Sequence, residues 1–189
     1  MKIILATESP RKINVMKTLG IKFKAVPAFF DEESVKEKDP LKLVEKLALE
    51  KARAIATKFP NDLVIGADTV MLVDGQITGK PKGLEEARKI VLKSSGKVID
   101  DATGIAVIAN GQERSASMIG KATLRSYSEK EVDKYLEETN PLDKAGGYAA
   151  DPAEGGRFLV SYKGEPGQEL GLPKTTLKSF LKEFGVTVL

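Results

Sequence analysis

The sequence contains no cysteine and no histidine in its 189 residues. Without cysteine the chain can form no disulfide, no thiolate nucleophile and no cysteine zinc site. Without histidine it can form no Ser–His–Asp triad and perform no imidazole acid–base catalysis, and the commonest ligand of transition metals is missing. If the protein is an enzyme, its proton transfers are therefore left to carboxylates and lysines. A bound metal would be a hard cation held by oxygen atoms.

Two further shortages bear on location and partners. No apolar run is long enough to cross a bilayer, and Met1-Lys2 leads directly into an apolar segment. We therefore expect a cytoplasmic protein with no signal peptide and no membrane partner. The formal net charge is only +3, and basic residues alternate with acidic ones along the chain, so we expect no nucleic-acid partner. The hydrophobic fraction of 41% and the charged fraction of 30% are typical of a soluble globular protein.

Apolar runs alternate with helix-like segments, which predicts a mixed α/β fold, a mixed sheet with flanking helices, rather than a uniform βαβ repeat. The expected strands lie near residues 2–6, 22–27, 63–67, 70–73, 76–78, 103–109, 112–124 and 157–163, with a short one after 184. The expected helices lie near residues 10–19, 39–58, 84–93, 128–138 and 173–184. Asp74-Gly75 and Asn110-Gly111 are typical of tight hairpin turns.

The first turn of the chain combines several features of a phosphate-binding site. Thr7-Glu8-Ser9-Pro10-Arg11-Lys12 joins a buried strand to a helix, so backbone N–H groups and the positive end of the helix dipole face outward. The same segment carries two hydroxyls, those of Thr7 and Ser9, and two cations, those of Arg11 and Lys12. An ordinary helix start is the alternative, because Ser9 as N-cap and Pro10 at the first helical position need no ligand.

A carboxylate follows the most apolar segment. Asp68 comes directly after Leu63-Val64-Ile65-Gly66-Ala67, and open α/β sheets place ligands and catalytic groups at the carboxyl ends of their strands. In a chain without histidine, Asp68 at the end of a strand is a natural metal ligand or general base. The alternative is that Asp68 caps a turn, as aspartate often does where a strand ends.

Two lysines also indicate chemistry. Lys51 falls in the middle of the apolar arc of its helix, where an ammonium is costly unless it is paired or reaches a cleft. A snorkelling lysine is the alternative there. In Thr78-Gly79-Lys80-Pro81 the glycine lets the backbone approach a ligand, and Pro81 fixes the direction of exit. A plain surface turn is the alternative, and the spacing of a P-loop is missing.

Six short motifs follow one another along the chain. They are Leu5-Ala6-Thr7-Glu8-Ser9-Pro10-Arg11-Lys12, Glu50-Lys51-Ala52, Gly66-Ala67-Asp68-Thr69, Gly79-Lys80-Pro81, Asp143-Lys144-Ala145-Gly146-Gly147-Tyr148 and Gly171-Leu172-Pro173. Together they resemble the motifs of the Maf family of nucleoside triphosphate pyrophosphatases, first described as septum formation inhibitors. The resemblance implies one Maf-like domain over residues 1–189, with the elongated, two-lobed α/β fold and central cleft that this family shares with inosine-triphosphate pyrophosphatases.

The resemblance also implies a reaction and a set of site residues. Water attacks the α-phosphorus of a nucleoside triphosphate, pyrophosphate leaves, and Mg²⁺ or Mn²⁺ assists. Asp68 is then the catalytic acid–base group and, with Glu32, a metal ligand. The residues implied to bind substrate are Ser9, Arg11, Lys12, Lys51, Thr69, Lys80 and Asp151.

The motifs bear on base choice as well. Arg11 and Thr69 match the branch of the family that acts on dTTP and UTP, so pyrimidine triphosphates are the expected substrates. Tyr148 is followed by Ala149-Ala150-Asp151, where that branch has Gly-Ile-Gln. A carboxylate near this point, from Asp151 or in a shifted alignment Glu154, is similar to a branch resembling 7-methyl-GTP pyrophosphatase. A modified purine triphosphate is therefore the alternative substrate.

An alternative from another class is a regulator of cell division that holds a nucleotide without hydrolysing it. The missing glutamine after Tyr148 supports that alternative. The presence of Asp68, Lys51 and Lys80 argues against it, because pure binding would not need a carboxylate beside the phosphates. Maf proteins often form homodimers, so the resemblance allows a second copy of the chain as a partner.

Overall fold

A computed structural model of the protein describes residues 1–148 and 156–188. The chain forms two compact units. The first unit comprises Met1–Asp68, Thr103–Met118 and Glu165–Leu189, and the second comprises Thr69–Ala102 and Ile119–Gly164. The chain passes between them four times. Three passages lie within long strands, β3 (Leu63–Val73), β5 (Val98–Ala109) and β6 (Gln112–Leu124), and the fourth lies between Gly164 and Glu165.

The mixed α/β fold predicted from the sequence is confirmed. Within the described residues, seven strands form one sheet in the order β2-β1-β3-β5-β6-β7, with β4 paired to β3. β1 is parallel to β2 and β3, whereas β4 is antiparallel to β3 and β7 is antiparallel to β6. The shorter strands are β1 (Ile3–Ala6), β2 (Lys24–Val26), β4 (Gln76–Thr78) and β7 (Leu159–Lys163). The α-helices are α1 (Pro10–Lys17), α2 (Pro40–Ala56), α3 (Leu84–Lys93), α4 (Glu129–Glu138) and α5 (Lys174–Glu183).

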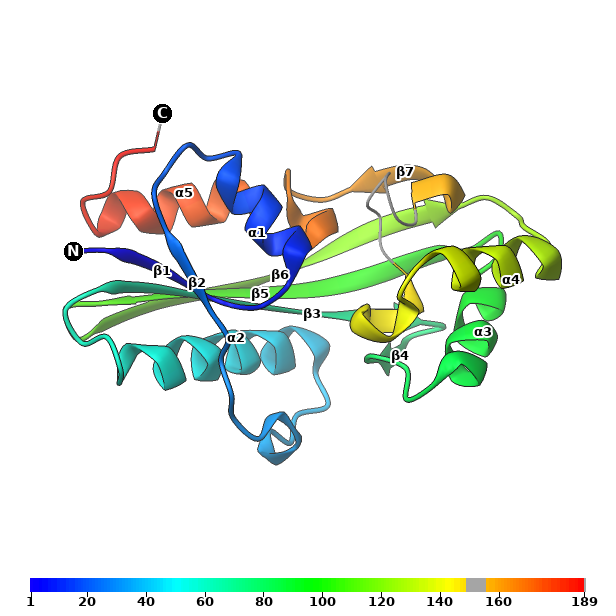
Figure 1. Ribbon diagram of the computed structural model, residues 1–189, viewed down its shortest axis with the longest axis horizontal. Helices are drawn as coiled ribbons and strands as arrows, with labels where there is room; N and C mark the ends of the chain where they lie inside the picture. Colours follow the sequence, from blue (N-terminus) through cyan, green and yellow to red (C-terminus); the bar gives the residue numbers. More distant parts are fainter. Residues whose placement is uncertain (149–155, 189) are drawn as a thin grey trace. The chain divides into compact units, whose positions relative to one another are not determined.

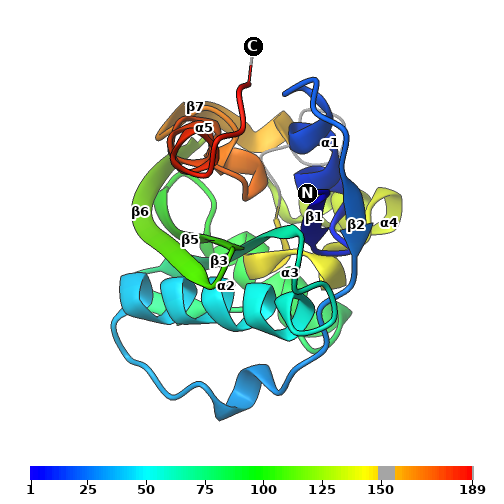
Figure 2. The ribbon, with the colours of Figure 1, turned by 90° about the vertical axis from the view of Figure 1, so that its left-hand side faces the viewer.

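In the first unit, α1 and α5 cover one face of the sheet and α2 covers the other, as Figures 1 and 2 show. Alternate residues of each strand face the two helical layers. The layer under α2 buries Ile4, Val64, Ala106 and Ile108 with Ala48, Ala52 and Ile55. The opposite layer buries Leu5, Ile65 and Val107 with Met16, Leu177 and Leu181. The even-numbered residues of this part of β3 therefore face α2.

The second unit is built around an aromatic cluster. Tyr127 stacks on Phe158 with ring centroids 4.1 Å apart, and Tyr135 meets the same Phe158 ring edge-on at 5.5 Å. Helices α3 and α4 pack against each other beside this cluster. The β3–β4 hairpin turns at Asp74 and Gly75, both with positive φ (52° and 74°), as the Asp-Gly pair predicts.

Several boundaries differ from the sequence-based expectation. Strand β3 does not end before Asp68 but continues to Val73, and β5 begins at Val98 rather than at residue 103. The expected final strand is absent from residues 185–188. Gly185, with φ of 77°, ends α5, and the N–H of Val186 donates to the carbonyl of Leu181, an arrangement that closes a helix end. The apolar residues that follow pack on the core instead of pairing.

The helices of the described residues include none that is long and apolar enough to cross a membrane. The longest, α2, has 17 residues and carries charged side chains along much of its length. It begins at Asp39, whose carboxylate accepts hydrogen bonds from the N–H groups of Leu41 and Lys42. These hydrogen bonds cap the start of the helix.

Candidate active site

A glycine brings helix α2 into direct contact with strand β3. A Cβ atom at Gly66 would lie 2.1 Å from the carbonyl oxygen of Ala48, so no residue with a side chain fits there without moving the helix. Gly104 of β5 contacts α2 in the same way, because a Cβ atom at Gly104 would lie 2.1 Å from the carbonyl oxygen of Val44. Because residues two apart on a strand share a face, Asp68 faces the same helix as Gly66.

Lys51 of α2 joins two carboxylates. Its ammonium donates a hydrogen bond to Oδ1 of Asp68 and forms an ion pair with Oε1 of Glu32 at 3.1 Å. Glu32 lies on a short 3₁₀ helix, Glu32–Ser34. The side chains of Lys51 and Asp68 are 15% and 12% exposed, whereas that of Glu32 is 54% exposed. The three charges therefore form a cluster that is closed at Asp68 and open to solvent at Glu32.

The electrostatics of this cluster keep Lys51 charged. Burial alone lowers the pKa of the Lys51 ammonium, but the negative charges and hydrogen bonds of Asp68 and Glu32 outweigh burial, so that pKa lies above its ordinary value. Lys51 is thus a paired lysine on the buried side of its helix. The sequence-based alternative of a snorkelling lysine is wrong.

The β1–α1 turn lies next to this part of β3 in the sheet. β1 pairs with β3 in parallel, with Leu5 opposite Ile65. If the same register continues, the residues that follow β1 lie opposite Gly66–Asp68. Ser9 occupies the N-cap position of α1, but its side chain makes no capping hydrogen bond; instead its N–H donates to the hydroxyl of Thr7 at 3.1 Å. Arg11 and Lys12 are half-buried in the first turn of the helix.

In the second unit, Lys80 lies on an exposed turn that another turn holds in place. The N–H of Gly146 donates to the carbonyl of Gly79 at 2.8 Å. Gly146 has φ of 65°, and the hydroxyl of buried Tyr135 donates to the carbonyl of the next residue, Gly147, at 2.9 Å. The motif that contains these glycines therefore fixes the backbone just before Lys80.

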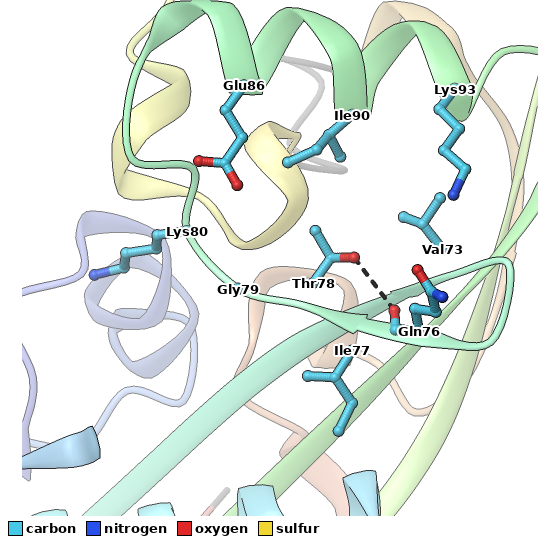
Figure 3. A pocket seen from close by; sticks show the side chains of 9 residues that line it. All are labelled: Val73, Gln76, Ile77, Thr78, Gly79, Lys80, Glu86, Ile90 and Lys93. Atoms are coloured by element: carbon cyan, nitrogen blue, oxygen red, sulfur yellow. Dashed lines mark hydrogen bonds between the residues drawn. The ribbon is translucent and has the colours of Figure 1, made fainter. Parts of the chain in front are cut away.

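Lys80 borders a pocket of about 290 Å³ between the β3–β4 hairpin and α3. Glu86 and Lys93 of α3 line one side, and Gln76 and Thr78 of β4 line the other. Figure 3 shows the Lys80 side chain pointing away from the other lining side chains. The ammonium of Lys80 therefore lies outside this pocket, where it can contact a ligand. Thr69, the residue after Asp68, lies on the opposite face of β3 by strand alternation.

The donor set of the first unit fits a hard divalent cation. Glu32 and Asp68 supply carboxylate oxygens that converge on one positive group, the Lys51 ammonium. No group of three or more acidic, histidine or cysteine side chains able to hold a metal occurs among residues 1–148 and 156–188. Mg²⁺ is commonly bound through one or two carboxylates, with water and substrate phosphates completing its octahedron. Glu32 and Asp68 meet that requirement.

Of the residues predicted from the sequence, the structure brings Lys51, Asp68 and Glu32 into contact. Asp151 and Glu154 lie outside the described residues. Sequence reasoning missed Gly66 and Gly146 as residues that position the lysines. A signal for Gly66 was present, because an isolated glycine inside an apolar strand indicates a close backbone approach.

The family model of Maf-like proteins matches residues 2–184. The chain belongs to the Maf family. A dTTP/UTP pyrophosphatase of Dictyoglomus thermophilum is 35% identical over 191 residues, an alignment that covers 100% of this chain and 98% of the relative. A nucleoside triphosphate pyrophosphatase of a Synechococcus species is 34% identical and covers 98% of this chain and 95% of the relative.

Solved structures with a similar fold are more distant in sequence. The Ham1 protein of Staphylococcus aureus has a TM-score of 0.56 and 13% identity, covering 97% of this chain and 99% of its own. A HAM1 protein of Coxiella burnetii has a TM-score of 0.51 and 16% identity, with the same coverage of both chains. At these identities the likeness concerns the fold alone.

Proposed function

We propose that this Maf protein is a nucleoside triphosphate pyrophosphatase that hydrolyses dTTP and UTP to the monophosphate and pyrophosphate. The observation that carries the proposal is the Glu32–Lys51–Asp68 cluster. The more exposed carboxylate of Glu32 and the nearly buried carboxylate of Asp68 both contact the Lys51 ammonium. Full-length relatives at 33–35% identity bear the name dTTP/UTP pyrophosphatase, which supports the same reaction and the pyrimidine substrates.

In this proposal Asp68 is the catalytic acid–base group. Its carboxylate is 12% exposed on the side-chain scale, and it accepts the proton of the water that attacks the α-phosphorus. Lys51 pairs with Asp68 in the nucleotide-free protein and supplies a positive charge to the bound phosphates. The bond from the α-phosphorus to the bridging oxygen breaks, and pyrophosphate leaves.

The cations and hydroxyls of other segments bind the triphosphate. Ser9, Arg11 and Lys12, at the start of α1, offer a hydroxyl, two cations and the N-terminal dipole of the helix. We assign Lys80 as a further phosphate-binding cation, and Thr69 and Asp151 as residues that contact substrate, on the strength of the family motifs. Localised positive charge is needed because negative charge develops on the leaving pyrophosphate.

A divalent cation, Mg²⁺ or Mn²⁺, would be held by Glu32 and Asp68. When bound there, such an ion supplies Lewis-acid stabilisation of phosphate charge and lowers the pKa of a coordinated water. The protein's own contribution is the placement of the two carboxylates. The contact of α2 with β3 at Gly66 sets Asp68 against Lys51, and Glu32 reaches Lys51 from the connection between β2 and α2.

The test is pyrophosphate release from a panel of triphosphates in the presence of Mg²⁺ or Mn²⁺. The panel contains dTTP, UTP, CTP, GTP, 7-methyl-GTP and modified pyrimidine triphosphates. We expect pyrophosphate and monophosphate in equal amounts, with dTTP and UTP turned over fastest. A preference for 7-methyl-GTP would replace the pyrimidine assignment by a modified purine. Nucleotide binding without any product would contradict the enzyme and favour a regulatory protein.

A further inference from the structure

The position that a divalent cation needs is already taken by a positive group of the chain. The Lys51 ammonium contacts a carboxylate oxygen of Asp68 and lies 3.1 Å from one of Glu32. These are the two carboxylates to which the proposed function assigns the metal. Lys51 extends from the buried side of α2, so its ammonium belongs to the cluster when no nucleotide is bound.

The ammonium and a divalent cation compete for the same oxygens. The ammonium and the metal ion would each contact Glu32 and Asp68. Where bulk water is excluded, two cations a few ångströms apart repel each other strongly. The side chains of Lys51 and Asp68 are nearly buried, so little water is present to screen that repulsion. A metal ion therefore gains both carboxylates only when the ammonium moves off them.

We propose that Lys51 is a built-in cation that occupies the divalent-metal position in the nucleotide-free protein and leaves it only when a triphosphate is present. This inference rests on the proposed function for the identity of the ligand that receives the ammonium. Phosphate oxygens are suitable acceptors, since a lysine donates to them as a point charge. The same side chain thus keeps the empty site neutralised and then binds substrate.

The proposal makes metal binding depend on nucleotide. In the free protein the carboxylate pair is already neutralised in part, so its affinity for Mn²⁺ or Mg²⁺ is weak. Once phosphates attract the ammonium, both carboxylates become available, and the metal also gains phosphate ligands. Metal and nucleotide then bind with positive cooperativity, which by linkage is the same in both directions.

The first experiment measures Mn²⁺ binding to the nucleotide-free protein from the loss of the free-ion electron paramagnetic resonance signal at pH 8. We expect Lys51→Met to bind Mn²⁺ at least about tenfold more tightly than the unaltered protein. The double variant Lys51→Met with Asp68→Asn should lose that gain. Equal or weaker binding by Lys51→Met would overturn the proposal.

A lysine on the same helix provides the matched control. Lys46 of α2 is 54% exposed and pairs with Glu37 at 2.8 Å, away from the cluster. Lys46→Met removes the same charge from the same helix, and we expect it to leave Mn²⁺ affinity unchanged. An equal gain from both variants would show a general charge effect and overturn the proposal. Circular dichroism melts establish that each variant is folded, and Lys51→Gln replaces Lys51→Met if the latter is not.

A second measurement repeats the titration with a dUTP analogue whose α–β bridge is an imido group. We expect the analogue to raise Mn²⁺ affinity strongly in the unaltered protein and less in Lys51→Met, where no ammonium has to leave. An identical increase in both proteins would contradict the displacement. Neither measurement needs turnover. A protein that fails to hydrolyse any triphosphate would refute the proposed function, while the Mn²⁺ titrations would still decide the role of Lys51.

Discussion

Lys51 and Lys80 are placed by the two units in different ways. In the first unit, Lys51 is carried by a long helix and fixed by two carboxylates, and the helix reaches the strand because Gly66 has no side chain. In the second unit, Lys80 is exposed on a turn, and only the backbone before it is fixed, by the N–H of Gly146. The buried lysine is therefore positioned by the carboxylates that pair with it, whereas the exposed lysine depends on the geometry of its main chain.

The largest effect is expected from Asp68→Asn in the first unit. Loss of the carboxylate that accepts the proton of the attacking water should lower kcat by about 1,000-fold or more, roughly 4 kcal/mol of transition-state stabilisation. Affinity for the nucleotide should change only a few-fold. Pyrophosphate release and calorimetric titration measure the two quantities.

The matched control is Asp74→Asn in the second unit. Asp74, like Asp68, is paired with lysine, here Lys97 at 2.9 Å and Lys93 at 3.2 Å, but its side chain is 43% exposed. Its turn position, with φ of 52°, is one that asparagine tolerates well. We expect Asp74→Asn to keep full turnover. If the two variants lost activity equally, the special role of Asp68 would be refuted.

Removal of the exposed lysine is the next most severe change. Lys80→Ala should reduce kcat/KM by roughly 10- to 100-fold, because a charged hydrogen bond to phosphate is worth about 1.5–3 kcal/mol. Lys82→Ala removes a neighbouring exposed lysine and serves as the control, with no expected change. Steady-state kinetics with dTTP measure kcat/KM for both variants. Equal values for Lys80→Ala and Lys82→Ala would count against the assignment of Lys80.

Gly66→Ala should destabilise the first unit. The added methyl group would lie 2.1 Å from the carbonyl oxygen of Ala48, so α2 must move, at a cost of about 1–3 kcal/mol. The move displaces Lys51 from its place beside Asp68 and the phosphates, and should lower kcat as well. Gly79→Ala, whose added Cβ meets no atom within 4 Å, is the stability control. Urea unfolding of the two variants would contradict this explanation if Gly66→Ala were as stable as Gly79→Ala.

Gly146→Ala should affect the second unit less. A side chain at φ of 65° costs about 1–2 kcal/mol, and the new Cβ would lie 3.1 Å from the Met71 side chain. We expect KM to rise more than kcat falls, because the turn before Lys80 loosens. Gly20→Ala has a similar positive φ of 68° and open space, so it should lose stability without a change in KM. A rise in KM for both variants would remove Gly146 from the positioning of Lys80.

The smallest effects distinguish two tyrosines of the second unit. Tyr135→Phe removes the hydrogen bond to Gly147 and should cost about 1 kcal/mol in urea unfolding. The Tyr148 hydroxyl is buried and has no hydrogen-bond partner in the described part of the chain. Tyr148→Phe should therefore be neutral or stabilising. If Tyr148→Phe lowered the free energy of unfolding more than Tyr135→Phe, the Tyr148 hydroxyl would be the stabilising one, and this prediction would be refuted.

Much of the first unit could be predicted from local patterns. The periodicity of 40–56 singled out Lys51 as a charge on an apolar face, and the structure confirms that it is paired. The end of β3 was predicted wrongly, because Asp68-Thr69 has the composition of a turn although the strand continues there and pairs with β4 farther along. The local sequence could not show that pairing with neighbouring strands would extend β3 beyond Asp68.

The position of Glu32 illustrates what local sequence cannot supply. It lies in the long connection between β2 and α2, where no periodic pattern fixes the path of the chain. Only the family resemblance pointed to it. Its contact with Lys51 depends on how that connection folds back on α2, which is a tertiary effect. The role of Gly146 is similar, because its partner Gly79 is distant in sequence.

The position of attack on the triphosphate is shown by the fate of the oxygen atom of the attacking water. dTTP is hydrolysed in water enriched in heavy oxygen, with Mg²⁺ present, and the products are separated and weighed by mass spectrometry. Attack at the α-phosphorus predicts that the label enters dTMP and that pyrophosphate carries none. Label in pyrophosphate, or the release of dTDP with orthophosphate, would contradict the reaction assigned to Asp68 and its cluster.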